Sequence, residues 1–370
     1  MKIRCAARRI VGVLLTVSLI TGCVRAADPI VLEAISRDAR ARQAAELFLN
    51  GYVDPDGRVV RRDQGGDTVS EGQAYALLIA AAVGDGVVFD RVWEWTREHL
   101  MQPNALPAWR IDAKGAIPDT QSASDADMLI AWALLRDTGP NRQNHHAAGL
   151  AIADAVLKHE VVITAAGAPV LVAGPWAVNK RAVNVSYWSS VVFDDLARLT
   201  GSPAWSAMAD QVSPMLDELT QGGALLPPDW AHLGDSHLQP SSSPQGVASS
   251  PSTRPQYGLD AQRAVVWSAV DCRRRADNDA ARWYRTLDNQ LRSGATGLAL
   301  NGDILNGTAH PVPLVASAAA AHAADDDGAA DSFMASAEDV YRKSPTFFGA
   351  AWIALGRVLL DTNALHPCQE

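Results

Sequence analysis

Three acidic residues stand at the predicted starts of helices: Glu71, Asp125 and Asp260. Glu71 follows Ser70 and precedes a run of Ala and Leu with helical spacing, so we expect Ser70 to cap that helix. A carboxyl group in the first turn lies near the open end of the helix, where it can donate or accept a proton in general acid–base catalysis. One such acid can simply favour the positive end of the helix dipole, so it is the set of three that suggests catalysis.

The second and third acids each have a charged neighbour. Asp125 and Asp127 are two residues apart and cannot share one face of a helix. Ser124 or Asp125 would cap the helix that begins here. We therefore expect Asp125 to reach a shared site, with Asp127 as a second candidate. Arg263 lies one turn after Asp260, within reach of its carboxylate. An arginine partner keeps a carboxylate ionised, as a general base must be.

Glycoside hydrolysis is a reaction that needs such a set of acids. One carboxylic acid protonates the leaving oxygen, and a second carboxylate activates water or attacks the sugar. The chain also contains 11 Trp against 6 Phe and 6 Tyr. Tryptophan offers a flat apolar face and an N–H donor, which suits sugar rings, although core burial is the better prediction for any single one.

The elements that must position these acids are helical almost throughout. The apolar spacing predicts helices over 30–52, 70–83, 88–100, 124–135, 144–158, 187–199, 203–220, 260–276, 279–293, 312–324, 331–342 and 347–360. Repeated helix pairs can form a solenoid or a closed barrel, and the absence of a fixed-period repeat favours the barrel. Residues 237–256 are rich in Ser and Pro and are predicted to form a mobile surface loop.

The first 26 residues have the pattern of a signal peptide, with a basic start and an apolar run too short to span a bilayer. Two outcomes stay open: cleavage after Ala26, or acylation of Cys23 within a lipobox-like sequence. Either predicts export, to the periplasm or as a secreted protein, and the second adds a lipid anchor. Residues 27–370 would then form one domain, in which a disulfide between Cys272 and Cys368 is an open alternative.

The net charge and the pattern of His and Cys residues also limit the classes of partner and cofactor that we expect. A net charge of −9 argues against binding to nucleic acid or to an anionic membrane surface. The nine His are scattered, and neither a CxxC nor an HExxH pattern is present, so we expect no metal and no cofactor. We expect a monomer.

Several ordered motifs together resemble glycoside hydrolase family 8, and within it the endoglucanases encoded beside bacterial cellulose synthases. They are DGRVV at 56–60, SEGQAY at 70–75, AWR at 108–110, ASDAD at 123–127, NVSYW at 184–188, LPPDW at 226–230 and YGLDAQR at 257–263. Each motif alone is weak, whereas the ordered combination is specific and covers most of the chain after residue 26.

The resemblance implies an all-α (α/α)6 barrel of six inner and six outer helices and an inverting endo-β-1,4-glucanase, or cellulase. Glu71 would be the general acid and must hold a proton near neutral pH, whereas Asp260 would be the general base. Inverting enzymes keep these two carboxyl groups roughly 6.5–9.5 Å apart, which leaves room for a water molecule. Asp125 would hold a distorted sugar, and Arg263 would position Asp260 or keep it ionised.

The candidates for further substrate contacts are Asp127, Trp109, Tyr187, Trp188, Trp230 and Tyr257, among which Trp109 ranks first for its place beside the acidic segment. The sequence departs from the family at two places. Leu129 stands where a third acid is usual, and Phe347-Phe348 stands where the family often has paired Tyr. A phenol can hydrogen-bond a sugar or water and a phenyl ring cannot, so we expect differences in rate and subsite preference.

Other functions fit parts of the sequence. A chitosanase or xylan-acting relative would use the same barrel, and an inactive glycan-binding envelope protein would explain the leader and the helices. The presence of both Glu71 and Asp260 in full motif context favours the enzyme. The expected partner is β-1,4-glucan, and the resemblance suggests a functional association with cellulose synthase during cellulose synthesis and export.

Overall fold

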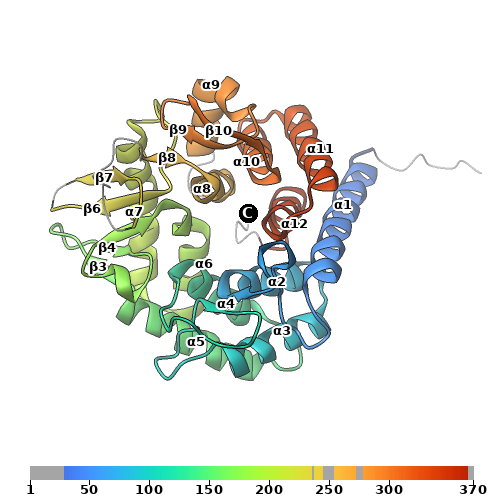
Figure 1. The fold of residues 1–370 in the computed structure, drawn as a ribbon, viewed down its shortest axis with the longest axis vertical. Helices are drawn as coiled ribbons and strands as arrows, with labels where there is room; N and C mark the ends of the chain where they lie inside the picture. Colours follow the sequence, from blue (N-terminus) through green and yellow to red (C-terminus); the bar gives the residue numbers. More distant parts are fainter. Residues whose placement is uncertain (1–28, 236, 245–253, 272–277, 366–370) are drawn as a thin grey trace, which may run out of the picture.

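The computed structural model describes residues 29–235, 237–244, 254–271 and 278–365 (Figure 1). The predicted signal peptide, Cys23 and the two cysteines of the possible disulfide, Cys272 and Cys368, lie outside these residues. None of the helices in the described ranges has the length and apolar character needed to cross a membrane.

Twelve α-helices dominate the described chain, at the places where the apolar spacing predicts them. They are α1 Pro29–Tyr52, α2 Ser70–Val83, α3 Gly86–His99, α4 Ser124–Arg136, α5 Arg142–His159, α6 Ser190–Thr200, α7 Pro203–Thr220, α8 Leu259–Ala269, α9 Asp279–Leu291, α10 Pro311–Ala323, α11 Asp327–Lys343 and α12 Phe347–Asp361. Short 3-10 turns occur at η1 Arg62–Gln64, η2 Pro175–Ala177 and η3 Val185–Tyr187.

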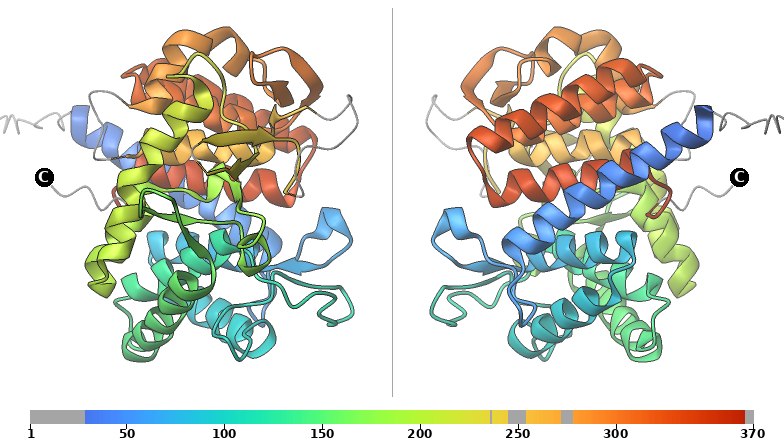
Figure 2. Two further views of the ribbon diagram at one scale, coloured as in Figure 1. Left: turned by 90° about the vertical axis from the view of Figure 1, so that its left-hand side faces the viewer. Right: turned by 90° about the vertical axis from the view of Figure 1, so that its right-hand side faces the viewer.

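The helices form two concentric rings (Figure 1), and Figure 2 shows the same helices from two sides. The even-numbered helices contact one another in a closed inner circle, in which α12 returns to pack on α2. The odd-numbered helices lie outside, and each packs against at least one inner helix. The inner helices are rich in Ala and buried on almost all sides, as α2, α10 and α12 illustrate, whereas outer helices such as α3 and α11 bury one stripe. The predicted (α/α)6 barrel is confirmed.

Short antiparallel strands connect the helices. They are β1 Thr68–Val69, β2 Arg110–Ile111, β3 Val161–Ile163, β4 Pro169–Leu171, β5 Ala182–Asn184, β6 Trp230–Leu233, β7 Leu238–Ser241, β8 Gln256–Tyr257, β9 Ala295–Ala299 and β10 Ile304–Ala309. They pair as β1-β2, β3-β4, β5-β6-β7 and β10-β9-β8. Strands β1 and β8 lead directly into α2 and α8, so this pairing fixes where two of the acid-bearing helices begin.

Two local predictions need correction. Strand β7 occupies the beginning of the segment 237–256, where it pairs with β6 and buries Leu238, so this part is not a free loop. Ser70 and Ser124 are the first helical residues of α2 and α4 rather than their caps. The Ser124 hydroxyl instead donates to the carbonyl of Val172, which fastens the start of α4 to the end of β4.

Most of the tryptophans belong to the hydrophobic core, which supports the cautious prediction for any single one. Trp132, Trp205, Trp283 and Trp352 are among the largest fully buried side chains. The indoles that stay partly exposed are those of Trp109, Trp176 and Trp230.

A buried amide joins α2 to the loop before it and to α3. Gln73 accepts a hydrogen bond from the backbone N–H of Val59 at 2.6 Å and donates to the carbonyl of Gly57 and to the Thr96 hydroxyl. Gln73 is fully buried, so these groups have no access to solvent when the amide is removed. Because Gln73 lies two residues after Glu71, the same bonds hold the first turn of α2.

We predict that Gln73→Leu lowers the free energy of unfolding by about 2–4 kcal/mol, because it leaves a buried N–H and a buried carbonyl without partners. Chemical denaturation measures the change, with the exposed Gln43→Leu as the matched control. Equal stability of the two variants would show that the network does not hold the helix.

Candidate active site

The three acids of the sequence analysis meet at one arginine. Glu71 comes from α2, Asp125 from α4, and Asp260 with Arg263 from α8. Nη1 of Arg263 donates to Glu71 and, at 3.2 Å, to Asp125. Nη2 donates to Asp260 at 2.8 Å. The predicted pair between Arg263 and Asp260 is therefore present, and the guanidinium also joins the other two acids.

The four side chains differ in their access to the cleft. The side chains of Arg263 and Asp125 are only 3% and 5% exposed. Glu71 and Asp260 are 23% and 36% exposed. The two accessible carboxyl groups bond to different terminal nitrogens of one guanidinium, and both are open to solvent. Asp125 is the least accessible of the three acids.

The cluster holds more negative than positive charge. Burial raises the pKa of Asp125 to about 7, the charge of Glu71 adds to the shift, and Arg263 opposes it. Although burial disfavours the cation, the surrounding anions and Tyr75 raise the pKa of Arg263 well above its usual value. Arg263 is therefore a permanent cation, and Asp125 can retain a proton near neutral pH.

Tyr75 supports Glu71 from one turn further along α2. Its hydroxyl donates to Glu71 at 2.8 Å and accepts from Arg263 at 3.0 Å and from the indole N–H of Trp352 at 3.2 Å. Burial raises the pKa of Tyr75 well above its usual value, so it stays a neutral donor. Sequence reasoning missed this residue, although its spacing of four from Glu71 was a usable signal.

Asp260 is held by partners from two other segments. The amide of Asn184, at the end of β5, donates to its second carboxylate oxygen at 3.0 Å. The side-chain oxygen Oδ1 of Asn184 accepts from the backbone N–H and the hydroxyl of Ser186, which fixes the orientation of the amide. Both oxygens of Asp260 thus have donors, and its carboxylate has a defined direction.

Asp229 fixes the start of the helix that carries Asp260. Its carboxylate accepts from the backbone N–H groups of Gly258 at 2.9 Å and Ala261 at 2.8 Å. Gly258 has no side chain to cap α8, and a Cβ there would lie 2.3 Å from Asp229. Burial, and then the charge of Asp260, raise the pKa of Asp229 to about 7, although its donors oppose the shift. Asp229 therefore acts as a remote cap, a role that its position in the sequence did not reveal.

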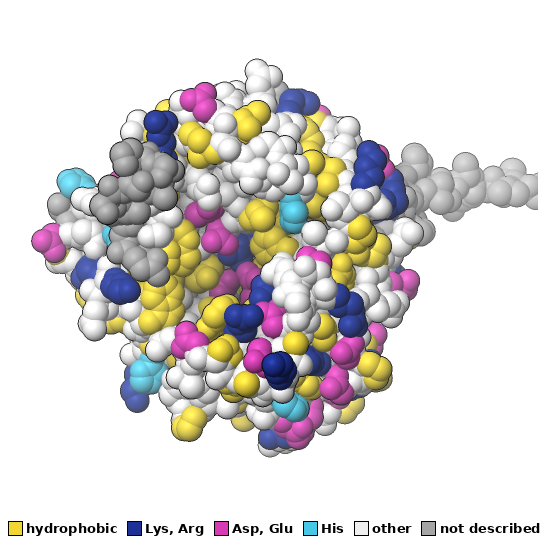
Figure 3. Space-filling view, in the orientation of Figure 1, with side chains coloured by type: hydrophobic (Ala, Val, Ile, Leu, Met, Phe, Trp, Pro, Cys, Tyr) yellow, Lys and Arg dark blue, Asp and Glu magenta, His cyan; other side chains and the backbone are white. Residues whose placement is uncertain are grey.

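Aromatic rings line the space around the cluster. Tyr187 and Phe348 each place a ring 5.7 Å from the guanidinium carbon of Arg263. Trp230 packs against Tyr187 at 6.5 Å and against Trp176 at 6.4 Å, which makes a row of partly exposed rings leading away from Arg263. Figure 3 shows acidic side chains at the bottom of a hollow in this face, with hydrophobic side chains beside them.

Trp109 is hydrogen-bonded to Ser70, the residue directly before Glu71. Its backbone carbonyl accepts from the N–H of Ser70, and its indole donates to Asp119 at 3.3 Å. The indole remains partly exposed, as a sugar platform requires. Trp176 was not among the predicted contacts, and its place outside the recognised motifs explains the omission.

The structure does not bring three of the predicted substrate contacts to the cleft, because their side chains are buried. Trp188 is 2% exposed and donates its indole N–H to the carbonyl of Leu171. Tyr257 is equally buried, in the hydrophobic core. Asp127 is fully buried and faces Glu160 rather than the cleft. In each case a neighbouring residue of the motif, rather than the predicted one, reaches the site.

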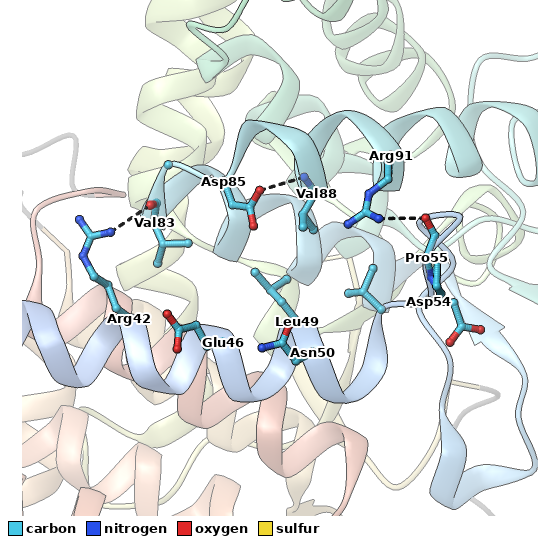
Figure 4. A pocket seen from close by; sticks show the side chains of 12 residues that line it. Arg42, Glu46, Leu49, Asn50, Asp54, Pro55, Val83, Asp85, Val88 and Arg91 are labelled. Carbon is cyan, nitrogen blue, oxygen red and sulfur yellow. Dashed lines mark hydrogen bonds between the residues drawn. The ribbon is translucent and has the colours of Figure 1, made fainter.

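A separate cavity of about 500 Å³ lies between α1 and the turn from α2 to α3 (Figure 4). Arg42 and Arg91 on its walls donate to the carbonyls of Val83 and Pro55, and Asp85 caps α3. The cavity is at the C-terminal end of α2, whereas Glu71 is at its N-terminal end, so it does not belong to the acidic cluster. Among the described residues there is also no group of acidic, His or Cys side chains that could hold a metal ion.

A closed double ring of helices with carboxyl groups at the inner N-termini is the architecture expected for a barrel-type glycoside hydrolase. The comparison with family models agrees, because the model of glycosyl hydrolases family 8 matches residues 26–353. The chain belongs to this family.

Individual relatives are similar over parts of the chain. An endoglucanase of Cellulomonas uda is 34% identical over 202 residues, which are 53% of this chain and 56% of that protein. A probable endoglucanase of Novacetimonas hansenii is 35% identical over 204 residues, which are 52% and 58%. The matched stretches thus span little more than half the length of these relatives. The solved structure of the endo-beta-1,4-glucanase CMCax from Acetobacter xylinum superposes with a TM-score of 0.70 at 26% identity, covering 87% of this chain and 98% of that one.

We predict that Asp229→Ala reduces kcat by ~10²-fold with a smaller effect on KM, because the start of α8 and the carboxylate of Asp260 lose their alignment. Asp229→Asn keeps the oxygen that accepts both N–H bonds and should retain most activity. Steady-state kinetics of the two variants test the role, and an alanine variant with unchanged kcat would contradict it.

Proposed function

We propose that this protein is an endo-β-1,4-glucanase that hydrolyses cellulose-type glucans with inversion at the anomeric carbon. The observation that carries the proposal is the placement of two accessible carboxyl groups, Glu71 and Asp260, on different terminal nitrogens of buried Arg263. Membership of glycosyl hydrolases family 8 and similarity to endoglucanases support it.

Glu71 is the general acid of the proposed reaction. It transfers a proton to the glycosidic oxygen as the bond from that oxygen to the anomeric carbon breaks. Tyr75 and Arg263, which bond to the Glu71 carboxyl, stabilise the carboxylate that remains.

Asp260 is the general base. It takes a proton from water as the water oxygen forms a bond to the anomeric carbon on the face opposite the leaving group. Arg263 and Asn184 keep its carboxylate oriented. Proton transfer from Asp260 back to Glu71 through solvent restores the starting state.

Asp125 and the aromatic rings bind the sugar in this proposal. Asp125 lies too deep to protonate a leaving group, but it can hold a sugar hydroxyl at the bottom of the cleft through its position beside Arg263. Trp109, Trp176 and Trp230 are exposed enough to stack on successive sugar rings. Because the glucan is uncharged, affinity depends on stacking and hydroxyl contacts rather than on the net charge of −9.

Export and a role in cellulose synthesis are further parts of the proposal. Export depends on the signal-like residues 1–26, which lie outside the described residues, and an association with cellulose synthase depends on the resemblance of the motifs. Preference for chitosan or xylan is the alternative within the same barrel. Comparison of the three polysaccharides as substrates distinguishes these functions.

We predict that Glu71→Gln and Asp260→Asn each lower the rate of reducing-end release from a soluble β-1,4-glucan by ~10²–10⁴-fold, the usual contribution of an acid or base group. Binding of the glucan should change little, because neither substitution alters the size of the side chain. The exposed Glu98→Gln serves as the control and should keep full activity.

Either variant with more than about a tenth of the wild-type rate would exclude its residue from the assigned role. Wild-type protein that releases more product from chitosan or xylan than from glucan would replace the proposed substrate. Glucan binding without hydrolysis of any of the three would support a glycan-binding protein instead.

A further inference from the structure

Two carboxyl groups that the proposed reaction does not use lie behind the active site. Asp127 is in the first turn of α4, two residues after Asp125, and Glu160 directly follows α5. Both side chains are completely buried. They face each other, with the Ser122 hydroxyl donating to Glu160 at 2.8 Å.

The pair has fewer hydrogen-bond donors than oxygens. Both oxygens of Asp127 and the second oxygen of Glu160 are buried without a hydrogen-bond partner among the described residues, and the Ser122 hydroxyl beside the pair can donate to one oxygen at a time. Two facing carboxylates that share one hydroxyl donor would be strongly unfavourable in the interior. One proton between them removes one charge and supplies the missing donor. The burial and the unpaired oxygens therefore favour a protonated carboxyl group here.

We propose that Asp127 and Glu160 share a proton, and that this proton-sharing pair is a positioning element that holds Asp125 in the cleft. Protonated, the pair ties the first turn of α4 to the end of α5. The functional part of this inference rests on the proposed function, because Asp125 is assigned there to the sugar, whereas the shared proton is a property of the folded chain.

The contacts around the pair show what it would hold. The backbone carbonyl of Glu160 accepts from the N–H of Val172, and Val172 in turn accepts from the Ser124 hydroxyl. The carbonyl of Ser122 accepts from the indole N–H of Trp176 at 3.2 Å. The pair thus lies where α4, α5, the β3-β4 hairpin and the aromatic row meet. Movement of the Asp127 and Glu160 side chains would therefore displace Asp125 and Trp176.

The charges that face the pair give the sign of its pH dependence. Burial and the charge of Glu160 raise the pKa of Asp127 well above its usual value, and Asp125 on the same helix adds to the shift. Burial raises the pKa of Glu160 to about 7. Beyond Asp125 lie Arg263 and the other two acids of the cluster.

Because both shifts are upward, the folded chain binds the proton more tightly than the unfolded chain. Stability from the pair is therefore fully present below the ordinary carboxyl range near pH 4 and is lost as pH rises toward about 7 and above. Loss of the proton leaves two facing anions, which should displace Asp125 and reduce kcat more than KM.

The test compares Asp127→Asn with Asp127→Leu in the full chain, with the exposed Asp154→Asn as the matched control. In Asp127→Asn the amide N–H₂ replaces the shared proton as the donor to Glu160. We expect kcat at pH 6 within about threefold of wild type, an alkaline limb of the kcat profile shifted to higher pH, and a melting temperature that falls less between pH 5 and 8. Asp127→Leu supplies no donor and should lower kcat at least tenfold.

An asparagine variant with the same pH profiles of kcat and melting temperature as wild type would overturn the proposal. So would an asparagine variant as impaired as the leucine variant, because it would show that the donor is irrelevant. If the protein hydrolyses no glucan, the proposed function fails separately, and the pH dependence of melting still tests the shared proton.

Discussion

The buried guanidinium of Arg263 is the group on which the arrangement of the site depends. It is the shared donor to Glu71, Asp125 and Asp260, which come from three different helices. Replacement of a buried cation in such a set leaves charges that the interior cannot solvate, at a cost of several kcal/mol. Further bonds orient this cluster: Tyr75 bonds to Arg263, Asn184 bonds to Asp260, and Asp229 bonds to the start of α8. Acidic groups that would otherwise repel one another can therefore lie together at the bottom of a cleft.

The barrel brings the three acids together. Because alternate helices form the inner ring, α2, α4 and α8 all begin at the same end, and a side chain in the first turn of each lies near the axis. The short strands before α2 and α8 set the exact start of those helices. Small residues matter here: a Cβ on Gly72 would lie 3.0 Å from Phe347, so the first turn of α2 packs closely against α12.

Much of this was predictable from the sequence, and the remainder shows what patterns do not contain. Helical spacing and the acidic motifs located the twelve helices, Glu71, Asp125 and Asp260, because these signals are local. Burial of Trp188, Tyr257 and Asp127 depends on which way each side chain points in the folded chain. Membership of a motif does not reveal that direction. The remote cap by Asp229 and the carboxyl pair of Asp127 and Glu160 join residues about 30 positions apart, which no periodicity can reveal.

In the proposed mechanism, Glu71 and Asp260 act on opposite faces of the scissile bond, with no covalent bond to the protein. Proton NMR of the first products released from a soluble β-1,4-glucan tests this assignment most directly. The α-anomer should appear first and convert slowly to the equilibrium mixture, and Glu71→Gln should release neither anomer at a comparable rate. Early β-anomer would contradict this mechanism, because retention requires a nucleophile in place of the base proposed for Asp260.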